Sequence, residues 1–147
     1  MDLQTIEDKL ELQELANKLF MFTDSGQWSR LEAEVFAEKV WFDMTSAGGE
    51  KPSLLPAGDI CALWKNGFTG LDAVHHQAGH YLIQFESAEA DIYAYAVAWH
   101  YRKAARNGHT RTFIGSYDLH AIETPPGWRL NKFTYHLKFM DGNETLQ

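Results

Sequence analysis

The 147-residue chain has a single cysteine, few basic residues and no long hydrophobic run. Because Cys61 is alone, no disulfide framework and no thiolate cluster for zinc or iron–sulfur chemistry can form within the chain. Only 13 Lys and Arg stand against 20 Asp and Glu, and the net charge of −7 leaves no basic face for a nucleic acid. The apolar run at residues 93–99 is about a third of a membrane-spanning helix. We therefore expect a soluble, cytoplasmic protein that binds neither nucleic acid nor membranes.

The apolar content points to one ordinary folded domain. Apolar residues make up 45% of the chain and aromatic residues 14%, which excludes disorder and provides for a sizeable core. The N-terminal segment is acidic and amphipathic, without a basic region followed by an apolar one, so no secretory signal is expected. In the absence of repeats and low-complexity tracts, we expect a single domain over residues 1–147.

The first half of the chain has mainly helical periodicity. Residues 5–23 predict an amphipathic helix, with Thr5 and Asp8 in capping-box spacing. The apolar stripe of this helix consists of Leu12, Leu15, Ala16, Leu19 and Phe22. The segment TDSGQW at 23–28 interrupts this helix, and a shorter helical pattern follows. The segments beyond it are predicted as a first strand (40–46), a long loop (47–56) and a third, short helix (59–66).

The second half has four β-type runs, at residues 74–85, 91–104, 110–122 and 128–138. The turns between them, among them Asn107-Gly108, are too short for parallel crossovers, so the four strands should be antiparallel neighbours. Helices followed by such a meander predict an α+β fold. We expect three N-terminal helices packed in the concave face of a strongly curved, mixed but mainly antiparallel sheet, which forms a cone with a pocket inside.

Alternation along a strand predicts which side chains share a face. The predicted groups are His76 with Ala78 and His80; Ala94, Ala96 and Ala98 with His100; and Ser116 with Asp118, opposite Phe113 and Tyr117. The alanine row fits either close helix packing or the floor of a pocket. The opposite face of the second run carries an aromatic row, Tyr93, Tyr95, Trp99 and Tyr101, for which we expect a contact between subunits of a homo-oligomer.

Asp24 is the acid of most interest, because it lies where a long apolar helix ends. It could cap the next helix, or it could point into the cone and hold a histidine in one tautomer. A histidine held in this way can remove a proton next to a carbonyl and return it to a leaving hydroxyl. The seven histidines contain neither a His-x-His pair nor an HExxH motif, and no G-x-S-x-G elbow occurs. Neither a metal site nor a serine hydrolase is therefore predicted.

Four stretches carry a family resemblance: FTDSGQWSRL at 22–31, LPAGDICALW at 55–64, HHQAGH at 75–80 and GSYDLHAIETPPGWRL at 115–130. In their order and spacing they resemble the SnoaL-like branch of the nuclear-transport-factor-2-like superfamily, and within it most closely the scytalone dehydratases. The resemblance covers the whole chain. It implies a cone-shaped α+β barrel of the cystatin-like type and a homotrimer or homodimer.

The resemblance also implies a set of catalytic residues. In the scytalone dehydratases and their dehydrochlorinase relatives, an aspartate after the first helix pairs with a histidine on the strand that follows the third helix. The matching residues here are Asp24 and His76, and His100 lies near the position of a second, assisting histidine. His76 would act as general base and then as general acid, with Asp24 as its orienting carboxylate.

The residues implied to bind substrate depart from the dehydratase pattern. Ser116 and Asp118 lie where these enzymes have serine and asparagine, while Thr23 and Met44 replace two tyrosines that activate the substrate carbonyl. Tyr117 could supply a phenol, but its strand phase predicts the face opposite Ser116 and His100. The loss of both tyrosines argues against scytalone itself as the substrate.

Together, these features favour a lyase of the dehydratase type that uses no cofactor. Its substrate would be a small hydrophobic molecule of cyclic or polyketide-like structure. The alternatives are an isomerase, cyclase or hydroxylase-type enzyme in the same pocket, since these reactions also begin with proton removal beside a carbonyl, or a binding domain without catalysis.

Overall fold

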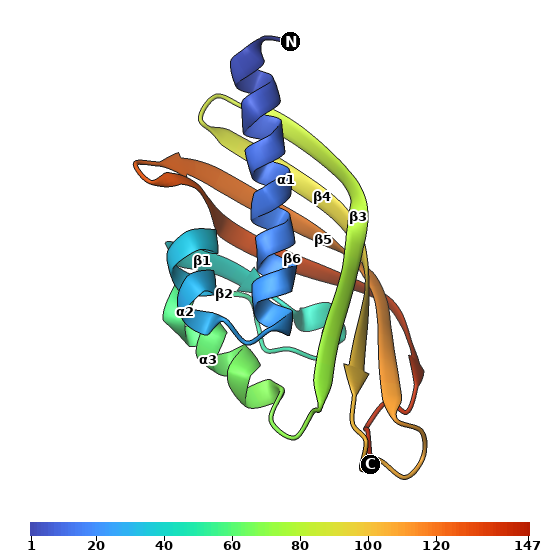
Figure 1. Ribbon diagram of the computed structural model, residues 1–147. Coiled ribbons are helices and arrows are strands. Elements are labelled where there is room, and N and C mark those ends of the chain that lie inside the picture. Colours follow the sequence, from blue (N-terminus) through green and yellow to red (C-terminus); the bar gives the residue numbers. More distant parts are fainter.

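Helices precede the long strands in the computed structural model, which describes all residues 1–147 (Figure 1). The helical elements are α1 (Leu3–Asp24), α2 (Trp28–Arg30), the π-helical turn η1 (Leu31–Val35), the 3-10 turn η2 (Thr45–Ala47) and α3 (Ala57–Gly67). The strands are β1 (Phe36–Asp43), β2 (Ser53–Pro56), β3 (Ala73–Glu86), β4 (Glu89–Tyr101), β5 (Thr110–Thr124) and β6 (Gly127–Gly142). The predicted α+β class is confirmed.

The six strands form one curved, open sheet in the order β2-β1-β6-β5-β4-β3. The four long strands β3 to β6 are antiparallel neighbours, as predicted, whereas β1 pairs in parallel with β6. Figure 1 shows α1 crossing the concave side of this sheet and α3 lying near the lower end of α1. The predicted arrangement of helices in the hollow of a mixed sheet is therefore confirmed.

Several element boundaries differ from the sequence expectation. Helix α1 begins at Leu3 and is capped by Asp2, whose carboxylate accepts the Thr5 backbone N–H at 2.8 Å, so the predicted Thr5 capping box is wrong. Strand β1 starts at Phe36, four residues earlier than predicted. The predicted loop contains β2, a short edge strand whose Ser53 pairs with Phe42. Such a strand has little pattern of its own and forms because β1 offers it an open edge.

The core lies between α1 and the sheet. All five residues of the predicted helical stripe are buried, namely Leu12, Leu15, Ala16, Leu19 and Phe22. The alanine row of β4 also faces inward, with Ala94, Ala96 and Ala98 each at most 6% exposed. Small side chains opposite the end of a helix leave volume that no protein group fills, and Ala98 borders the resulting cavity.

A β-bulge in β3 changes which residues face the interior. The pairing of β3 with β4 shifts between Gly79 and Leu82, and His80 has a φ of 56°. Because the bulge adds a residue to one strand, the alternation reverses beyond it. His80 therefore points outward and Tyr81 inward, where its hydroxyl donates to Asn17 Oδ1 on α1 at 2.6 Å. The prediction that His80 shares a face with His76 and Ala78 is wrong for this reason.

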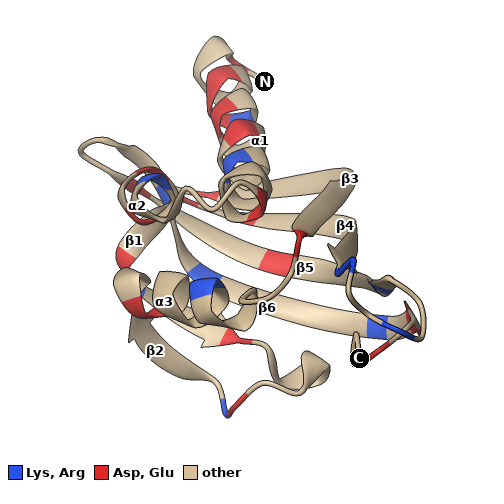
Figure 2. Ribbon diagram, turned by 60° about the horizontal axis from the view of Figure 1, so that its bottom comes forward, with Lys and Arg blue, Asp and Glu red and all other residues tan.

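The convex face of the sheet is solvent-exposed and carries the predicted aromatic row. Tyr95 is 56% exposed and Trp99 is 36% exposed. The contact with a second subunit expected there stays a prediction. Figure 2 shows acidic and basic residues together along the outer part of α1. None of the helices is both long and apolar enough to cross a membrane.

A substitution at Gly115 tests the packing of β5 against β6. A Cβ at this position would collide with the His136 carbonyl oxygen and with the Tyr135 hydroxyl, and the former belongs to backbone that cannot move freely. We expect Gly115→Ala to lower the free energy of unfolding by about 1–3 kcal/mol, measured by urea denaturation. Gly67→Ala is the matched control, since a Cβ there meets nothing within 4 Å. Equal stability of the two variants would contradict this packing.

The convex face should also give a pH-dependent contribution to stability. Burial lowers the pKa of His120, but hydrogen bonds to Asp91 and Glu89 outweigh it, so the pKa is raised above 6.5. The native state then holds the proton more tightly, and the stabilisation is complete below the unfolded pKa and is lost as pH rises through the folded pKa. We expect the stability difference between the wild type and His120→Gln to shrink from about pH 6 to about pH 8. A stability difference between the two proteins that does not change with pH would refute this prediction.

Candidate active site

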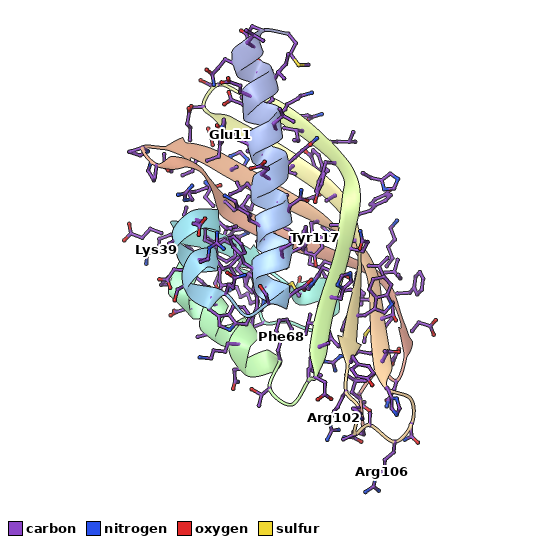
Figure 3. The ribbon with its side chains drawn as sticks, viewed as in Figure 1. Glu11, Lys39, Phe68, Arg102, Arg106 and Tyr117 are labelled. Atoms are coloured by element: carbon purple, nitrogen blue, oxygen red, sulfur yellow. The ribbon has the colours of Figure 1, made fainter.

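An apolar pocket of about 120 Å³ opens between the end of α1, α3 and the concave face of the sheet. Of its 14 lining residues, 11 are hydrophobic, and its walls are largely aromatic. In Figure 3, Tyr117 of β5 and Phe68, just after α3, lie toward the end of α1 where this pocket is formed. Two histidines, His76 and His100, are the titratable nitrogen groups in the lining, so any acid–base chemistry in the pocket centres on them.

Asp24 and His76 form the main polar contact at the pocket. The Oδ1 atom of Asp24 lies 2.6 Å from His76 Nδ1, and its Oδ2 atom accepts the His76 backbone N–H at 2.8 Å. The two side chains are only 17% and 10% exposed, respectively. The N-cap of α2 is Gln27, so Asp24 does not cap that helix. Both carboxylate oxygens are directed at a single residue, which fixes the position of its ring.

The contact determines which nitrogen of neutral His76 faces the pocket as a base. An ionised carboxylate only accepts hydrogen bonds, so Nδ1 must carry the proton and Nε2 is left with a free lone pair. His76 Nε2 has no protein partner, and the single buried side-chain atom without one is Asn131 Oδ1. His76 Nε2 is therefore reached from the cavity that its ring lines.

His100 lies beside His76 on the inner face but has a different partner. On β4 it pairs with Val74, two residues from His76, so the two histidines are diagonal neighbours. The Nε–H of Arg111 donates to His100 Nδ1 at 2.9 Å. Burial, and next the charge of Arg111, lower the pKa of His100 to about 3. His100 is thus uncharged at neutral pH and cannot serve as a second base that gains a proton.

The residues expected to bind substrate divide into two groups. Thr23 and Met44 line the pocket, although the Thr23 hydroxyl donates within α1 to the Leu19 carbonyl at 2.6 Å. Ser116 and Asp118 lie outside it. They pair directly with Tyr95 and Tyr93 of β4 and so share the convex face, where Asp118 contacts His136 at 3.0 Å. The expectation that Ser116 and Asp118 touch a ligand in this pocket is corrected accordingly.

Two tyrosines that the sequence reasoning set aside or missed face the cavity instead. Tyr117 pairs with the inward-facing Ala94, and its ring centroid lies 4.8 Å from that of Tyr135. Burial raises the pKa of both phenols, that of Tyr135 to about 12, so both keep their protons. Neither hydroxyl has a hydrogen-bond partner in the protein, and neither is among the fully buried polar atoms that lack one. Both are therefore open to the pocket that the two rings line. The register between β4 and β5 is the signal that would have identified Tyr117.

The comparisons with known proteins agree with this architecture. The model of the SnoaL-like domain matches residues 4–134. Comparison with curated proteins gives no match. Among solved structures, the Kfla4162 protein from Kribbella flavida is similar to the chain, with a TM-score of 0.91 and 27% identity over 99% of this chain and 98% of that one.

Two further similar structures come from Novosphingobium aromaticivorans. A candidate aromatic ring hydroxylase has a TM-score of 0.82 and 22% identity, with 96% of each chain covered. A candidate scytalone dehydratase has a TM-score of 0.79 and 12% identity, with 95% of this chain and 90% of that one covered. At these identities the likeness concerns the fold, so the chemistry has to be argued from the site.

The Asp24 contact predicts the tautomer of His76. At a pH where the ring is neutral, ¹⁵N NMR of the wild type should show the His76 proton on Nδ1, and Asp24→Ala should move it toward Nε2 because the acceptor for the Nδ1 proton is lost. Asp118→Ala is the control, since it removes a carboxylate from His136 on the other face. An unchanged His76 spectrum in Asp24→Ala would disprove the assignment.

Proposed function

The chain belongs to the SnoaL-like domain family, and we propose that it is a lyase of the dehydratase type. The substrate we infer is a small hydrophobic cyclic β-hydroxy ketone, from which the enzyme removes water. The observation that carries this proposal is the double contact of Asp24 with His76 at the edge of an apolar pocket. Asp24, His76 and His100 are the proposed catalytic group.

The proposed reaction begins with His76 Nε2, which takes a proton from the carbon next to the carbonyl. The electron pair of the broken C–H bond forms the enolate, and the negative Asp24 stabilises the imidazolium that results. In the second step the C–OH bond breaks, the enolate collapses to the conjugated ketone, and the leaving hydroxyl takes the proton back from Nε2. One water is released and no net proton is exchanged, so a single histidine is sufficient for both transfers.

The surroundings of the pair support proton transfer. The ring of Phe20 lies 5.5 Å from that of His76, and the pocket is lined mainly by hydrophobic side chains. In such a low-dielectric site, fixed hydrogen bonds act more strongly on developing charge than they do in water. The similarity in fold to a candidate scytalone dehydratase is an analogy that favours the same reaction class.

Isomerisation, ring closure and hydroxylase-type chemistry are the alternative reactions for this pocket. They share the first step. The likeness in fold to a candidate aromatic ring hydroxylase is the observation that favours hydroxylase-type chemistry among them. The fate of the enolate separates them: loss of hydroxide gives a conjugated ketone, whereas return of the proton at another carbon gives an isomer of equal mass. Product analysis by mass spectrometry distinguishes these outcomes.

Exchange of α-protons of cyclic ketones in D₂O, followed by NMR, tests the first step without knowledge of the leaving group. We expect the wild-type protein to accelerate the exchange. In His76→Ala the exchange rate should fall by on the order of 10²-fold or more, because the positioned base is removed. His75→Ala is the matched control, since His75 is exposed on the other face, where it contacts Gln77 and its ring lies 5.9 Å from that of Trp99.

The exchange experiment can refute the proposal in two ways. Undiminished exchange in His76→Ala would show that another group is the base. Absence of exchange by the wild type over a panel of single-ring ketones that bind would instead favour a binding domain without catalysis.

A further inference from the structure

His100 and His76 face the same pocket but are held in complementary states. Arginine has only donors, so the Arg111 Nε–H at 2.9 Å from His100 Nδ1 requires a lone pair on that nitrogen. The proton of neutral His100 must then sit on Nε2. A second proton on Nδ1 would point at the guanidinium, which agrees with the strongly lowered pKa of His100. His76 therefore presents a lone pair and His100 an N–H.

The Nε2 atom of His100 opens into the pocket. The imidazole lies between Phe68 and Phe113, with ring centroids 5.4 Å and 5.0 Å away, and both of these rings are pocket walls. No protein group accepts a hydrogen bond from His100 Nε2, and this atom is not among the fully buried polar atoms that lack a partner. The other charged or titratable groups that act on His100 are Arg111 on β5, His76 on β3 and Asp24 on α1. None of these supplies an acceptor for Nε2, so the donor is available to a ligand.

Tyr117 has a donor on the same side of the sheet, but farther along the pocket. It pairs with Ala94, whereas Arg111 pairs with His100, and these two positions are about 20 Å apart along the strands. Tyr117 and Phe113 come from the inner face of β5, and burial keeps the Tyr117 phenol protonated. Like His100 Nε2, its hydroxyl has no protein partner. An uncharged donor such as His100 Nε2 in an apolar pocket suits an oxygen that carries partial or growing negative charge, such as a ketone becoming an enolate.

The pocket volume limits the size of the molecule that bears this oxygen. An apolar cavity of about 150 Å³ accepts benzene, and this pocket measures about 120 Å³. A single six-membered ring is therefore the size that matches the space beside the two histidines. The fused rings of a polyketide-like substrate, which the sequence left open, would have to extend past Met44 and Phe68 into the neighbouring pocket that these side chains also line.

We propose that Arg111 is a positioning residue that fixes His100 as an uncharged Nε2–H donor, and that this donor binds the oxygen of a single-ring ketone. The inference deepens the proposed function and rests on the same pocket. It names the substrate class: a monocyclic ketone whose carbonyl lies at His100 and whose acidic C–H lies at His76.

Isotope-edited infrared spectroscopy of bound ¹³C=O cyclohexanone tests this proposal without a reaction. We expect the carbonyl stretch to shift to lower frequency in the wild type and to lose most of that shift in His100→Phe and Arg111→Met. Cyclohexanone should bind about 3- to 10-fold more weakly to both variants, the loss of one hydrogen bond. Methylenecyclohexane, which lacks the oxygen, should bind equally to all three proteins.

A conservative variant separates positioning from a structural role. Arg111→Lys keeps a donor toward His100 Nδ1 and should retain most of the carbonyl shift, while ¹⁵N NMR should find the His100 proton on Nε2. Arg111 also reaches the Glu144 carbonyl at 3.4 Å, so circular dichroism checks the fold of Arg111→Met, and His100→Phe provides a second variant that leaves this contact intact.

The outcomes are distinct from those of the exchange experiment. A carbonyl shift and affinity unchanged in folded Arg111→Met and in His100→Phe would overturn the proposal, as would a His100 proton on Nδ1 in the wild type. A shift that persists in His76→Ala, together with lost exchange, supports both the oxygen site and the base. A shift in wild-type protein that catalyses no exchange would uphold the oxygen site and refute the proposed function.

Discussion

The contact between Asp24 and His76 joins the end of α1 to strand β3, and the pocket depends on it. Through the backbone N–H of His76 it ties the helix to the sheet edge, and through Nδ1 it orients the ring. A carboxylate at the C-terminal end of a helix is disfavoured by the helix dipole, typically by about 0.3–1 kcal/mol. Two hydrogen bonds to one residue offset this cost. The interaction is therefore better explained by the position it imposes on His76 than by stability alone.

Two neighbouring histidines acquire different properties because their Nδ1 partners differ in kind. A carboxylate at His76 requires a proton on Nδ1, and a guanidinium at His100 forbids one. The same imidazole chemistry thus gives an acceptor and a donor on one pocket wall. Since the rest of that wall is largely aromatic, water competes poorly with a ligand for both groups.

Small residues create the space in which these groups meet. Ala98 of β4 lines the cavity, and Gly115 of β5 leaves room for the ring of Tyr135, which is another lining residue. The bulge at His80 turns Tyr81 toward α1, where it bonds to Asn17 and anchors the helix above the pocket. The outline of the cavity is thus set by absent side chains as much as by those that line it.

Local pattern was sufficient for the long helices and strands, though not for the short edge strand β2, and for the side-chain alternation within most strands. The apolar stripe of α1, the four long strands and the inward alanine row all follow from periods of 3.6 and 2, which act over a few residues. The family resemblance pointed to Asp24 and His76. The pattern of the chain itself left Asp24 open, because a turn aspartate can equally cap a helix.

Only the tertiary structure decided which faces of neighbouring strands coincide. Ser116 and Tyr117 alternate correctly, but the pairing of Tyr117 with Ala94 places the tyrosine inside and the serine outside. The bulge that sends His80 outward is likewise a property of the pairing with β4. Alternation is local, whereas register is set by contacts between residues far apart in the chain, and a shift of one residue exchanges the two faces.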